Sequence, residues 1–367
     1  MSVKTFAVLL GSLFACSQAA VAADAPASPA KASGKIELKS GGPLAFAPEG
    51  VLLVADPMAA TIYAVETGDA DGDAKSVKHE VADLRGKIAA LLGASSEEVQ
   101  INDLAVNPAS GNVFISVTRG SGPSGQPLVL KLEPSGKISE LELDNVAFTK
   151  AEITNAPASG EGRRGNPRLM TVTDLAFIDG KVYIAGLSNE EFASKLRTLP
   201  FPFAAADDGS SVEIFHGAHG RVETNSPIMT FAAFEIDNQP HVVAAYTCTP
   251  LVKFKVADLV PEAKVRGTTV AELGNRNRPL DMFVYKKDGK DYILLSNSSR
   301  GLMKIDAQGI GSQEGINEKI DDKAGLSYET IEVLKGVVQL DRLGEDTAVA
   351  LITGPDGKED LKTIELP

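Results

Sequence analysis

The chain has 367 residues, of which 43% are hydrophobic and 5% aromatic, and it contains no tryptophan. That apolar share is enough for a large buried core, which must be built mainly on Val, Leu, Ile and Ala. The formal net charge of −13 argues against nucleic acid or an anionic membrane surface as a partner, because both attract basic proteins.

The N-terminus has the pattern of an export signal. Lys4 supplies a positive charge, residues 6–14 form an apolar stretch, and Ala20-Val21-Ala22 is a small-residue cleavage site. The apolar stretch is too short to span a bilayer. We therefore expect residues 1–22 to be a signal peptide, which places the mature protein in the periplasm or outside the cell.

The next segment is rich in Ala, Pro and Ser, so we interpret residues 23–35 as a flexible linker and residues 36–367 as a single domain. A rival interpretation of the N-terminus is a lipid anchor on Cys16, because the four residues that end at this cysteine resemble a bacterial lipoprotein motif. No later apolar run in the sequence reaches the ~18 residues of a membrane-spanning helix.

Six short apolar segments recur along the rest of the chain, about 50 to 70 residues apart. Each is followed by a polar turn and further apolar runs, which is typical of a β-propeller blade. The segments are Pro43-Leu44-Ala45-Phe46, Asp103-Leu104-Ala105-Val106, Asp174-Leu175-Ala176-Phe177, Thr230-Phe231-Ala232-Ala233, Asp281-Met282-Phe283-Val284 and Val338-Gln339-Leu340-Asp341. The pattern predicts an all-β, six-bladed propeller, with seven blades as the alternative if the longest interval hides another repeat.

Within the repeats, turn residues separate the expected strands. In chain order the strands are expected at 44–46, 51–54, 61–65, 103–106, 113–117, 128–132, 138–143, 174–178, 182–185, 212–215, 231–236, 242–246, 251–256, 281–285, 292–295, 302–305, 337–340, 348–352 and 361–364. Leu84, Ile88, Leu91 and Leu92 lie at helical spacing and predict a short helix between the first two repeats. Residues 193–203 contain two prolines and are interpreted as an inserted surface loop, a candidate flap.

The two ends of the domain predict how the ring closes. The last repeat supplies only three strands before the chain stops, and residues 36–38 have no other place. We therefore expect this N-terminal strand to pair with the outer edge of the last blade. Such closure removes exposed sheet edges, which otherwise invite aggregation.

One face of the expected propeller collects polar side chains. The starts of the inner strands and the connections between second and third strands meet there, around the mouth of the central channel. The candidate ligand-binding residues are Asp103, Asn189, Arg276, Arg278, Asn297, Arg300 and Cys248, and the candidate catalytic residues are Asp174 and Asp281.

Two interpretations of the three recurring aspartates stay open. In the structural one, each carboxylate accepts backbone N–H groups of its own or a neighbouring blade. In the functional one, the carboxylates hold a divalent cation such as Ca²⁺, which prefers oxygen ligands. Arginines at the same mouth suit a small polar or anionic ligand.

Cys248 becomes the lone cysteine once the export signal is removed. It is either a buried small hydrophobe or a reactive or metal-binding thiol. A second candidate site combines His216, His219 and Glu223, because imidazole and carboxylate groups suit zinc or copper. The competing interpretation is a tight glycine-rich hairpin, which we expect on the face away from the mouth.

The chain resembles the six-bladed propellers that include the gluconolactonase-like, strictosidine-synthase-like and NHL-repeat proteins. The resemblance runs from about residue 36 to the C-terminus and rests on the blade pattern at residues 103–115 and 174–184. Lactonase-type members hold a divalent cation at the channel mouth with Glu, Asn and Asp side chains. The resemblance implies that Asp103, Asp174, Asp281 and Asn297 have such roles here, whereas NHL-type members mostly bind partners.

Three functions follow as hypotheses. The first is an exported binding or scaffold propeller that recognises a protein partner or a small polar molecule at the mouth. The second is a metal-dependent lactonase or esterase, in which Asp174 or Asp281 is the general base. The third is a redox-linked propeller with a metal at His216 and His219, either with or without Cys248 as a further ligand.

Overall fold

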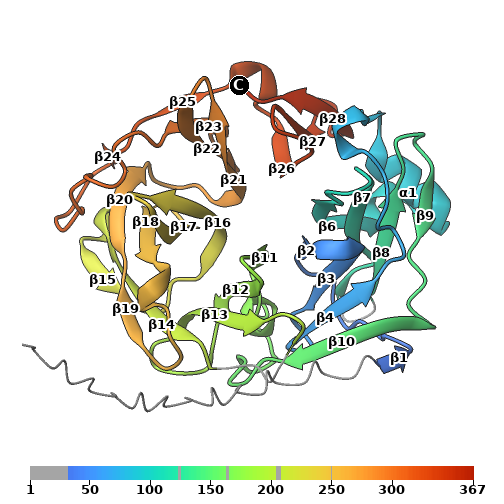
Figure 1. The fold of residues 1–367 in the computed structure, drawn as a ribbon, viewed down its shortest axis with the longest axis horizontal. Helices are drawn as coiled ribbons and strands as arrows, with labels where there is room; N and C mark the ends of the chain where they lie inside the picture. The colour runs from blue at the N-terminus through green and yellow to red at the C-terminus, as the bar shows by residue number, and fades with distance from the viewer. Residues whose placement is uncertain (1–31, 123–124, 163–164, 204–207, 249) are drawn as a thin grey trace, which may run out of the picture.

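The computed structural model describes residues 32–122, 125–162, 165–203, 208–248 and 250–367. The expected signal peptide, Cys16 and most of the expected linker lie outside this range. Six sheets, antiparallel except for the pairing of β14 with β19, surround a central axis, so the predicted all-β, six-bladed propeller is confirmed (Figure 1). None of the described helices is long and apolar enough to cross a membrane.

The blades are numbered in the order in which their innermost strands occur along the chain. The first blade contains, from the axis outwards, β2 (Leu44–Ala47), β3 (Val51–Asp56), β4 (Thr61–Glu66), β10 (Val146–Glu152) and β1 (Ala32–Gly34). The second contains β6 (Val99–Val106), β7 (Val113–Arg119), β8 (Gln126–Leu132) and β9 (Ile138–Glu140). The third contains β11 (Asp174–Ile178), β12 (Lys181–Leu187), β13 (Ser194–Pro200), β14 (Ser210–His216) and β15 (Arg221–Glu223), with β19 (Lys264–Arg266) paired to β14.

The other three blades follow the same plan. The fourth contains β16 (Ile228–Ile236), β17 (Gln239–Tyr246), β18 (Pro250–Lys255), β20 (Thr268–Leu273) and β24 (Lys323–Gly325). The fifth contains β21 (Pro279–Lys287), β22 (Lys290–Asn297), β23 (Gly301–Asp306) and β25 (Tyr328–Thr330). The sixth contains β26 (Val337–Arg342), β27 (Thr347–Thr353), β28 (Glu359–Glu365) and β5 (Glu80–Val81).

The described part of the chain has one α-helix, α1 (Leu84–Leu92), and several 3₁₀ turns. The 3₁₀ turns are η1 (Pro48–Gly50), η2 (Ala74–Ser76), η3 (Ser96–Glu98), η5 (Pro167–Met170), η6 (Gly217–His219), η7 (Val256–Asp258) and η8 (Glu332–Leu334). The helix confirms the prediction from apolar spacing. Asp83 caps its N-terminus by accepting the N–H of Gly86, and Leu84 and Ile88 are fully buried.

The blades do not follow one another around the ring in chain order. Six buried apolar clusters fill the boundaries between neighbouring blades, and they join blades 1 and 2, 2 and 6, 6 and 5, 5 and 4, 4 and 3, and 3 and 1. Contacts between the inner strands give the same order (Figure 1). The second blade therefore lies between the first and the sixth. The second and third blades are consequently not neighbours in the ring.

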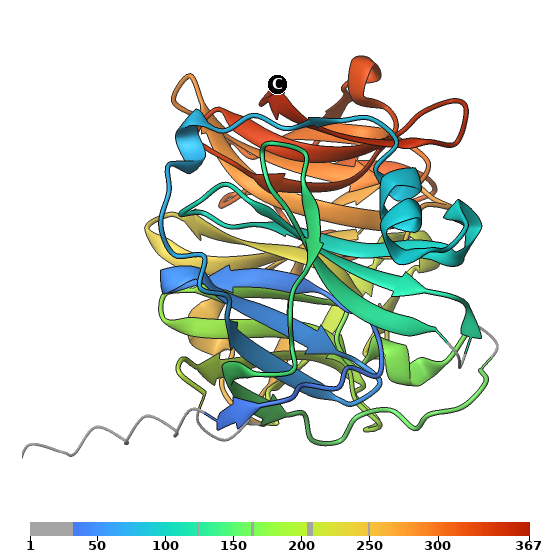
Figure 2. The same cartoon turned by 90° about the vertical axis from the view of Figure 1, so that its right-hand side faces the viewer.

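A crossing segment makes this order possible. Residues 67–79, which we call the strap, leave β4 and pass the second blade on the face opposite α1 (Figure 2). The strap then forms β5 on the edge of the sixth blade. The chain builds the second blade afterwards and returns to the first blade through β10, which pairs with β4 along five residues. The first blade is thus completed only after the second blade has been built.

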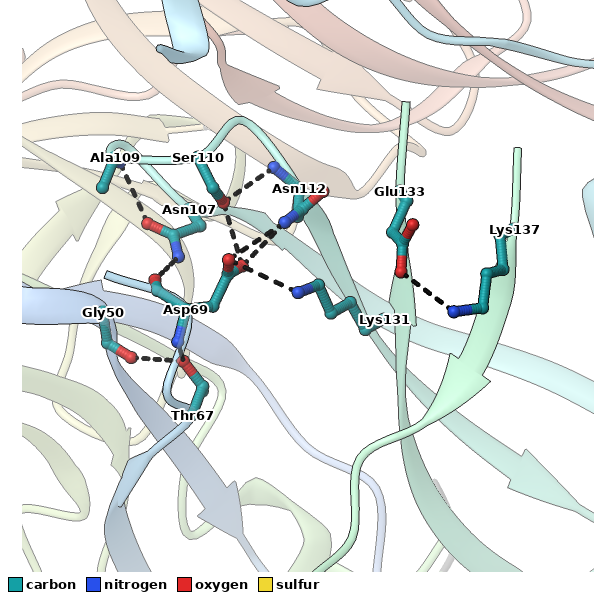
Figure 3. Close-up of polar contacts among 10 residues, drawn as sticks. All are labelled: Gly50, Thr67, Asp69, Asn107, Ala109, Ser110, Asn112, Lys131, Glu133 and Lys137. Carbon is teal, nitrogen blue, oxygen red and sulfur yellow. Dashed lines mark hydrogen bonds and ion pairs between the residues drawn. The ribbon is translucent and has the colours of Figure 1, made fainter. Parts of the chain in front are cut away.

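The strap is fixed to the second blade by the side chain of Asp69 (Figure 3). Its carboxylate accepts hydrogen bonds from Asn112 Nδ2 at 2.9 and 3.1 Å and from Ser110 Oγ at 2.9 Å. Lys131 Nζ lies 3.3 Å from the same group. Although burial opposes it, these contacts hold the pKa of Asp69 below its usual range. The carboxylate therefore locks the strap to the hairpin between β6 and β7.

The predicted closure by residues 36–38 is wrong. The sixth blade is closed by β5, in which Val81 is paired with Leu361 and Glu80 with Lys362. Residues 32–34 pair instead with β10 of the first blade, and the N–H of Ile36 donates to the carbonyl of Leu143. The apolar pattern indicated that these residues pair with a sheet, but it carried no information on which sheet edge they pair with.

The predicted insertion at 193–203 is also wrong. Most of it forms β13, the third strand of the third blade, which pairs with β12 along seven residues. The apolar pattern did not reveal this strand, because two of its buried positions are occupied by the charged residues Lys195 and Arg197. The segment expected as the third strand is therefore the fourth, β14, which runs toward the mouth of the channel.

Candidate ligand site at the channel mouth

The inner strands begin on one face of the propeller, which we call the mouth face. Because successive strands of a blade are antiparallel, the connections between second and third strands lie on the same face. The loops before β2, β6, β11 and β21 gather there around the channel. The mouth is thus formed by segments far apart in the sequence.

The three recurring aspartates each hold the first strand of a neighbouring blade. The Oδ2 atom of Asp103 accepts the N–H of Leu44 at 2.7 Å. Asp174 Oδ2 accepts the N–H of Phe231, and Asp281 Oδ2 that of Leu340, both at 2.9 Å. These bonds match the structural interpretation of the repeat, in which the carboxylates fasten one blade to the next.

Asp341 also fastens one blade to the next, and the sequence analysis did not identify it as a residue of this kind. Its Oδ2 accepts the N–H of Val106 at 2.7 Å and so joins the sixth blade to the second. It lies later in its strand than the other three aspartates, outside the repeated position. The signal that could have found it is a carboxylate directly after the apolar run of the sixth repeat.

The aspartates are crowded around one axis, and their pKa values rise. Desolvation raises the pKa of Asp103 and Asp281 well above the usual range, and neighbouring carboxylates add to the effect. Desolvation also raises the pKa of Asp174 to about 7 and that of Asp341 to about 6, although backbone N–H groups oppose it. Near neutral pH these four aspartates are therefore only partly ionised.

A small polar cavity of about 140 Å³ lies against these aspartates. Its lining residues are Pro43, Asn102, Asp103, Thr173, Asp174, Met229, Thr230, Arg278, Pro279, Leu280, Asp281 and Gln339. A larger cavity of about 950 Å³ opens above it on the mouth face. Five lining residues belong to both, namely Pro43, Asn102, Thr173, Met229 and Arg278. We call the two together the mouth site.

The walls of the large cavity combine apolar and charged side chains. Met58, Met170 and Met229, three of the six methionines in the chain, line it together with Leu169. Methionine side chains adapt to ligands of irregular shape. The charged residues that line the mouth site are Lys39, Arg278, Glu97, Glu98, Glu161, Asp103, Asp174 and Asp281. Among the described residues of the lining, carboxyl groups therefore outnumber basic groups.

Two polar side chains, one buried and one half-buried, hold the loops of this cavity in place. Asp56, which is fully buried, accepts the N–H of Lys39 at 2.6 Å and the hydroxyl of Ser40 at 2.8 Å. Arg168 donates to the carbonyls of Met58 and Pro157 at 3.2 and 3.0 Å. These bonds give the cavity fixed walls before any ligand arrives.

The structure brings Asp103, Asp174, Asp281 and Arg278 together at the mouth site. The other candidates, Asn189, Arg276, Asn297, Arg300 and Cys248, are absent from its described lining. Asn102, which precedes Asp103 at a strand start expected at the mouth, belongs to the lining, and so does Gln339, which was not predicted there.

Two of the candidates outside the mouth site hold loops together. Asn297 is buried, and its Oδ1 accepts the N–H groups of Ser299 and Arg300 at 3.0 and 3.2 Å. The Arg300 guanidinium donates to Tyr328 and to the carbonyl of Asn275. Both side chains therefore shape the loops of the fifth blade.

Cys248 lies in the loop between β17 and β18 with a positive φ of 65°. Its N–H donates to the carbonyl of Asn277 at 2.9 Å, and it is neither fully buried nor fully exposed. The left-handed backbone at a non-glycine residue marks a tight turn. The chemical role of the thiol stays a prediction.

His216, His219 and Glu223 form a second cluster, at the outer edge of the third blade. The expected position on the face away from the mouth is wrong, because β14 is a fourth strand and ends on the mouth face. His216 Nδ1 lies 3.0 Å from Glu223 Oε2, and His219 Nδ1 lies 2.7 Å from Glu223 Oε1. Although burial opposes it, these contacts and one from Ser226 hold the pKa of Glu223 well below its usual range.

The fold and its hollow mouth define the chain as a six-bladed β-propeller with a ligand-sized cavity at one end of the channel. No protein-family model matches the chain, and no curated protein matches it either.

Solved structures show distant likenesses. An engineered GH43 glycoside hydrolase with endo-xylanase and exo-arabinofuranosidase activity is 12% identical with a TM-score of 0.39, over 74% of this chain and 51% of that one. This chain thus spans about half of that enzyme. The GH43 endo-arabinanase from Bacillus licheniformis is 12% identical with a TM-score of 0.35, over 73% and 94% of the two chains. The plexin A4 extracellular region is 10% identical with a TM-score of 0.40, over 92% and 47%.

Proposed function

We propose that the protein is an exported binding propeller that holds a small polar molecule at the mouth site. The observation that carries the proposal is the direct connection between the large cavity and the smaller, aspartate-lined one through shared residues. Small-molecule sites have volumes of roughly 300–1,000 Å³ and combine apolar walls with a few fixed polar groups. Export rests on the N-terminal sequence alone.

The charges indicate the kind of ligand. Because carboxyl groups outnumber Lys39 and Arg278 among the described lining residues, the site favours an uncharged molecule with several hydroxyl groups over an anion. Asn102 and Gln339 add amide groups at the base of the cavity. A protein partner that inserts such a side chain would use the same groups.

The test is a thermal-shift screen of polyols, sugars and small amines, followed by titration calorimetry on any molecule that stabilises the protein. Arg278→Ala removes a side chain that lines both cavities and should weaken binding about 10-fold. Arg276→Ala is the matched control, because it removes an exposed arginine of the same loop that is absent from the described lining. Equal effects of the two substitutions, or a screen without a single stabilising molecule, would count against the proposal.

A metal-dependent lactonase or esterase, as in the gluconolactonase-like propellers, is the second candidate. It is favoured by the convergence of Asp103, Asp174 and Asp281 on one cavity. However, both carboxylate oxygens of Asp174 accept backbone N–H groups, at 2.8 and 2.9 Å. Metal analysis decides the matter: one tightly held Ca²⁺ per chain, lost in Asp281→Asn, supports this candidate.

A further inference from the structure

The histidine cluster is fixed between two blades. The turn that carries it is tied to β20 of the fourth blade, because the N–H of Gly217 donates to Glu272 Oε1. The hydroxyl of Thr269 donates to the carbonyl of Phe215 at 2.7 Å, and the N–H of Ile320 to the carbonyl of Gly217 at 3.0 Å. The backbone around His216 is therefore held from both sides.

The side chains converge on one carboxylate. The Nδ1 atoms of His216 and His219 both approach Glu223, and the imidazole ring centroids are 3.9 Å apart. One ligand atom from each of the three residues lies within 4.8 Å of the others. In a tetrahedral metal site with bonds of about 2.0–2.2 Å, ligand atoms lie about 3.3–3.6 Å apart, so small side-chain movements would bring the three into a coordinating arrangement.

The cluster is largely shielded from water. His216 is 2% exposed, Glu223 7% and Glu272 1%, so two carboxyl groups are buried side by side with one imidazole. The only guanidinium on Glu223 among the described residues belongs to Arg221, whose side chain is 72% exposed. Buried carboxylates need charge compensation, which one largely solvated arginine supplies poorly.

A buried imidazole nitrogen without a hydrogen bond also favours a metal site at this cluster. Among the described residues, the buried Nε2 atom of His216 has no hydrogen-bond partner. Glu272 Oε2 likewise lacks a hydrogen bond of ordinary geometry there. Histidines that bind a metal through one nitrogen almost always donate the other N–H to a carboxylate or carbonyl. Glu272, whose pKa is influenced by the charge of His216, is the nearby carboxyl group that could take this role after a side-chain movement.

From these contacts we propose that His216, His219 and Glu223 bind a divalent transition-metal ion, with zinc as the best fit. The two Nδ1 atoms and a Glu223 oxygen are the ligands, and water fills the remaining position on the side of the exposed His219. Two imidazole ligands select zinc over Ca²⁺ or Mg²⁺, which prefer oxygen. Binding displaces any protons on the Nδ1 atoms and neutralises the buried carboxylates.

The three proposed ligands all belong to the outer edge of the third blade, next to β20 of the fourth blade. This metal site does not rest on the proposed function, because His216, His219 and Glu223 line neither of the two cavities of the mouth site. The site can therefore be tested without knowing the ligand of the propeller.

The test uses the full-length protein, stripped with a chelator and titrated with ZnCl₂ in a calorimeter. We expect one zinc per chain and a raised melting temperature. His219→Ala should weaken binding on the order of 100-fold, and Glu223→Gln at least about 10-fold. His219 is suited to the test because its side chain is 46% exposed, so its loss leaves the core intact.

The matched control is His241→Ala. Unlike His219, this histidine is buried; it belongs to β17, and its Nδ1 lies 2.8 Å from the carbonyl of Gln239. Zinc affinity should stay within about twofold of the unsubstituted protein. Co²⁺ gives a second readout, because a site with two imidazole ligands produces visible d–d absorption bands that His219→Ala should abolish. Absence of zinc binding, or equal losses in His219→Ala and His241→Ala, would overturn the proposal.

Discussion

At the scale of single residues, the mouth aspartates are subject to opposing influences on their pKa. Backbone N–H groups of the neighbouring blade favour the ionised form, whereas desolvation and nearby carboxyl groups favour the protonated form. Desolvation prevails, so the pKa of Asp174 rises to about 7. The carboxyls that hold the blades together are for this reason sensitive to pH.

The predicted consequence is a loss of stability between acidic and neutral pH. In the unfolded chain an aspartate releases its proton near pH 3.9, whereas Asp174 in the folded protein keeps it up to about pH 7. The stabilising contribution is therefore complete below the unfolded pKa and is lost as the pH rises through the folded pKa.

Asp174→Asn removes this titration. The substitution costs about 1–3 kcal/mol at pH 5, because an amide has one acceptor oxygen for two N–H donors. The deficit should shrink at pH 8, where the carboxyl of the unsubstituted protein is itself unfavourable. Thermal unfolding at both pH values measures the change, with Asp71→Asn as an exposed control. The same deficit at both pH values would refute the explanation.

The sequence allowed part of this site to be predicted. Asp103, Asp174 and Asp281 were found because they occupy the same position of the repeat. Asn102 was expected at the mouth as the neighbour of Asp103, whereas Gln339 was not, since an amide near a strand start has no pattern of its own. The histidine pair was found by its composition, but its face was predicted wrongly because β13 was missed.

At the scale of elements, the strap determines which edge closes the sixth blade. β5 has only two residues, too short for any apolar periodicity to reveal it. Its position depends on the strap, which lies close against the second blade. A Cβ at Gly111, where φ is 75°, would come within 3.0 Å of Val77, so this turn needs a glycine.

We predict that Asp69 contributes most to this attachment. Asp69→Ala should lower the free energy of unfolding by about 1–3 kcal/mol, because it leaves Asn112 and Lys131 without their buried partner. A double-mutant cycle with Asn112→Ala should show a coupling of about 1 kcal/mol. Chemical denaturation measures both quantities.

The control lies in the same region (Figure 3). Lys137→Ala breaks the exposed pair with Glu133, whose N···O distance is 3.4 Å, and should cost less than about 0.5 kcal/mol. If the effect of Asp69→Ala is equally small, the strap is held by its backbone and apolar contacts rather than by this carboxylate.

At the scale of the whole molecule, the order of the blades decides where the site forms. Asn102 and Asp103 of the second blade meet Pro43 on one side and Gln339 on the other only because this blade lies between the first and the sixth. The number of blades could be predicted from the sequence, since each repeat needs its own sheet. Their order could not, because apolar strands of different repeats pack against one another equally well.

A disulfide cross-link tests this arrangement most directly. With Cys16 and Cys248 replaced by serine, Glu80→Cys and Lys362→Cys place thiols on paired residues of β5 and β28. Oxidation should link these positions within one chain, as peptide mass spectrometry after proteolysis will show. The combination of Glu37→Cys with Lys362→Cys should stay reduced. The opposite result, with a bond from 37 to 362 and none from 80 to 362, would mean that residues 36–38 close the sixth blade and would contradict the ring order on which the mouth site depends.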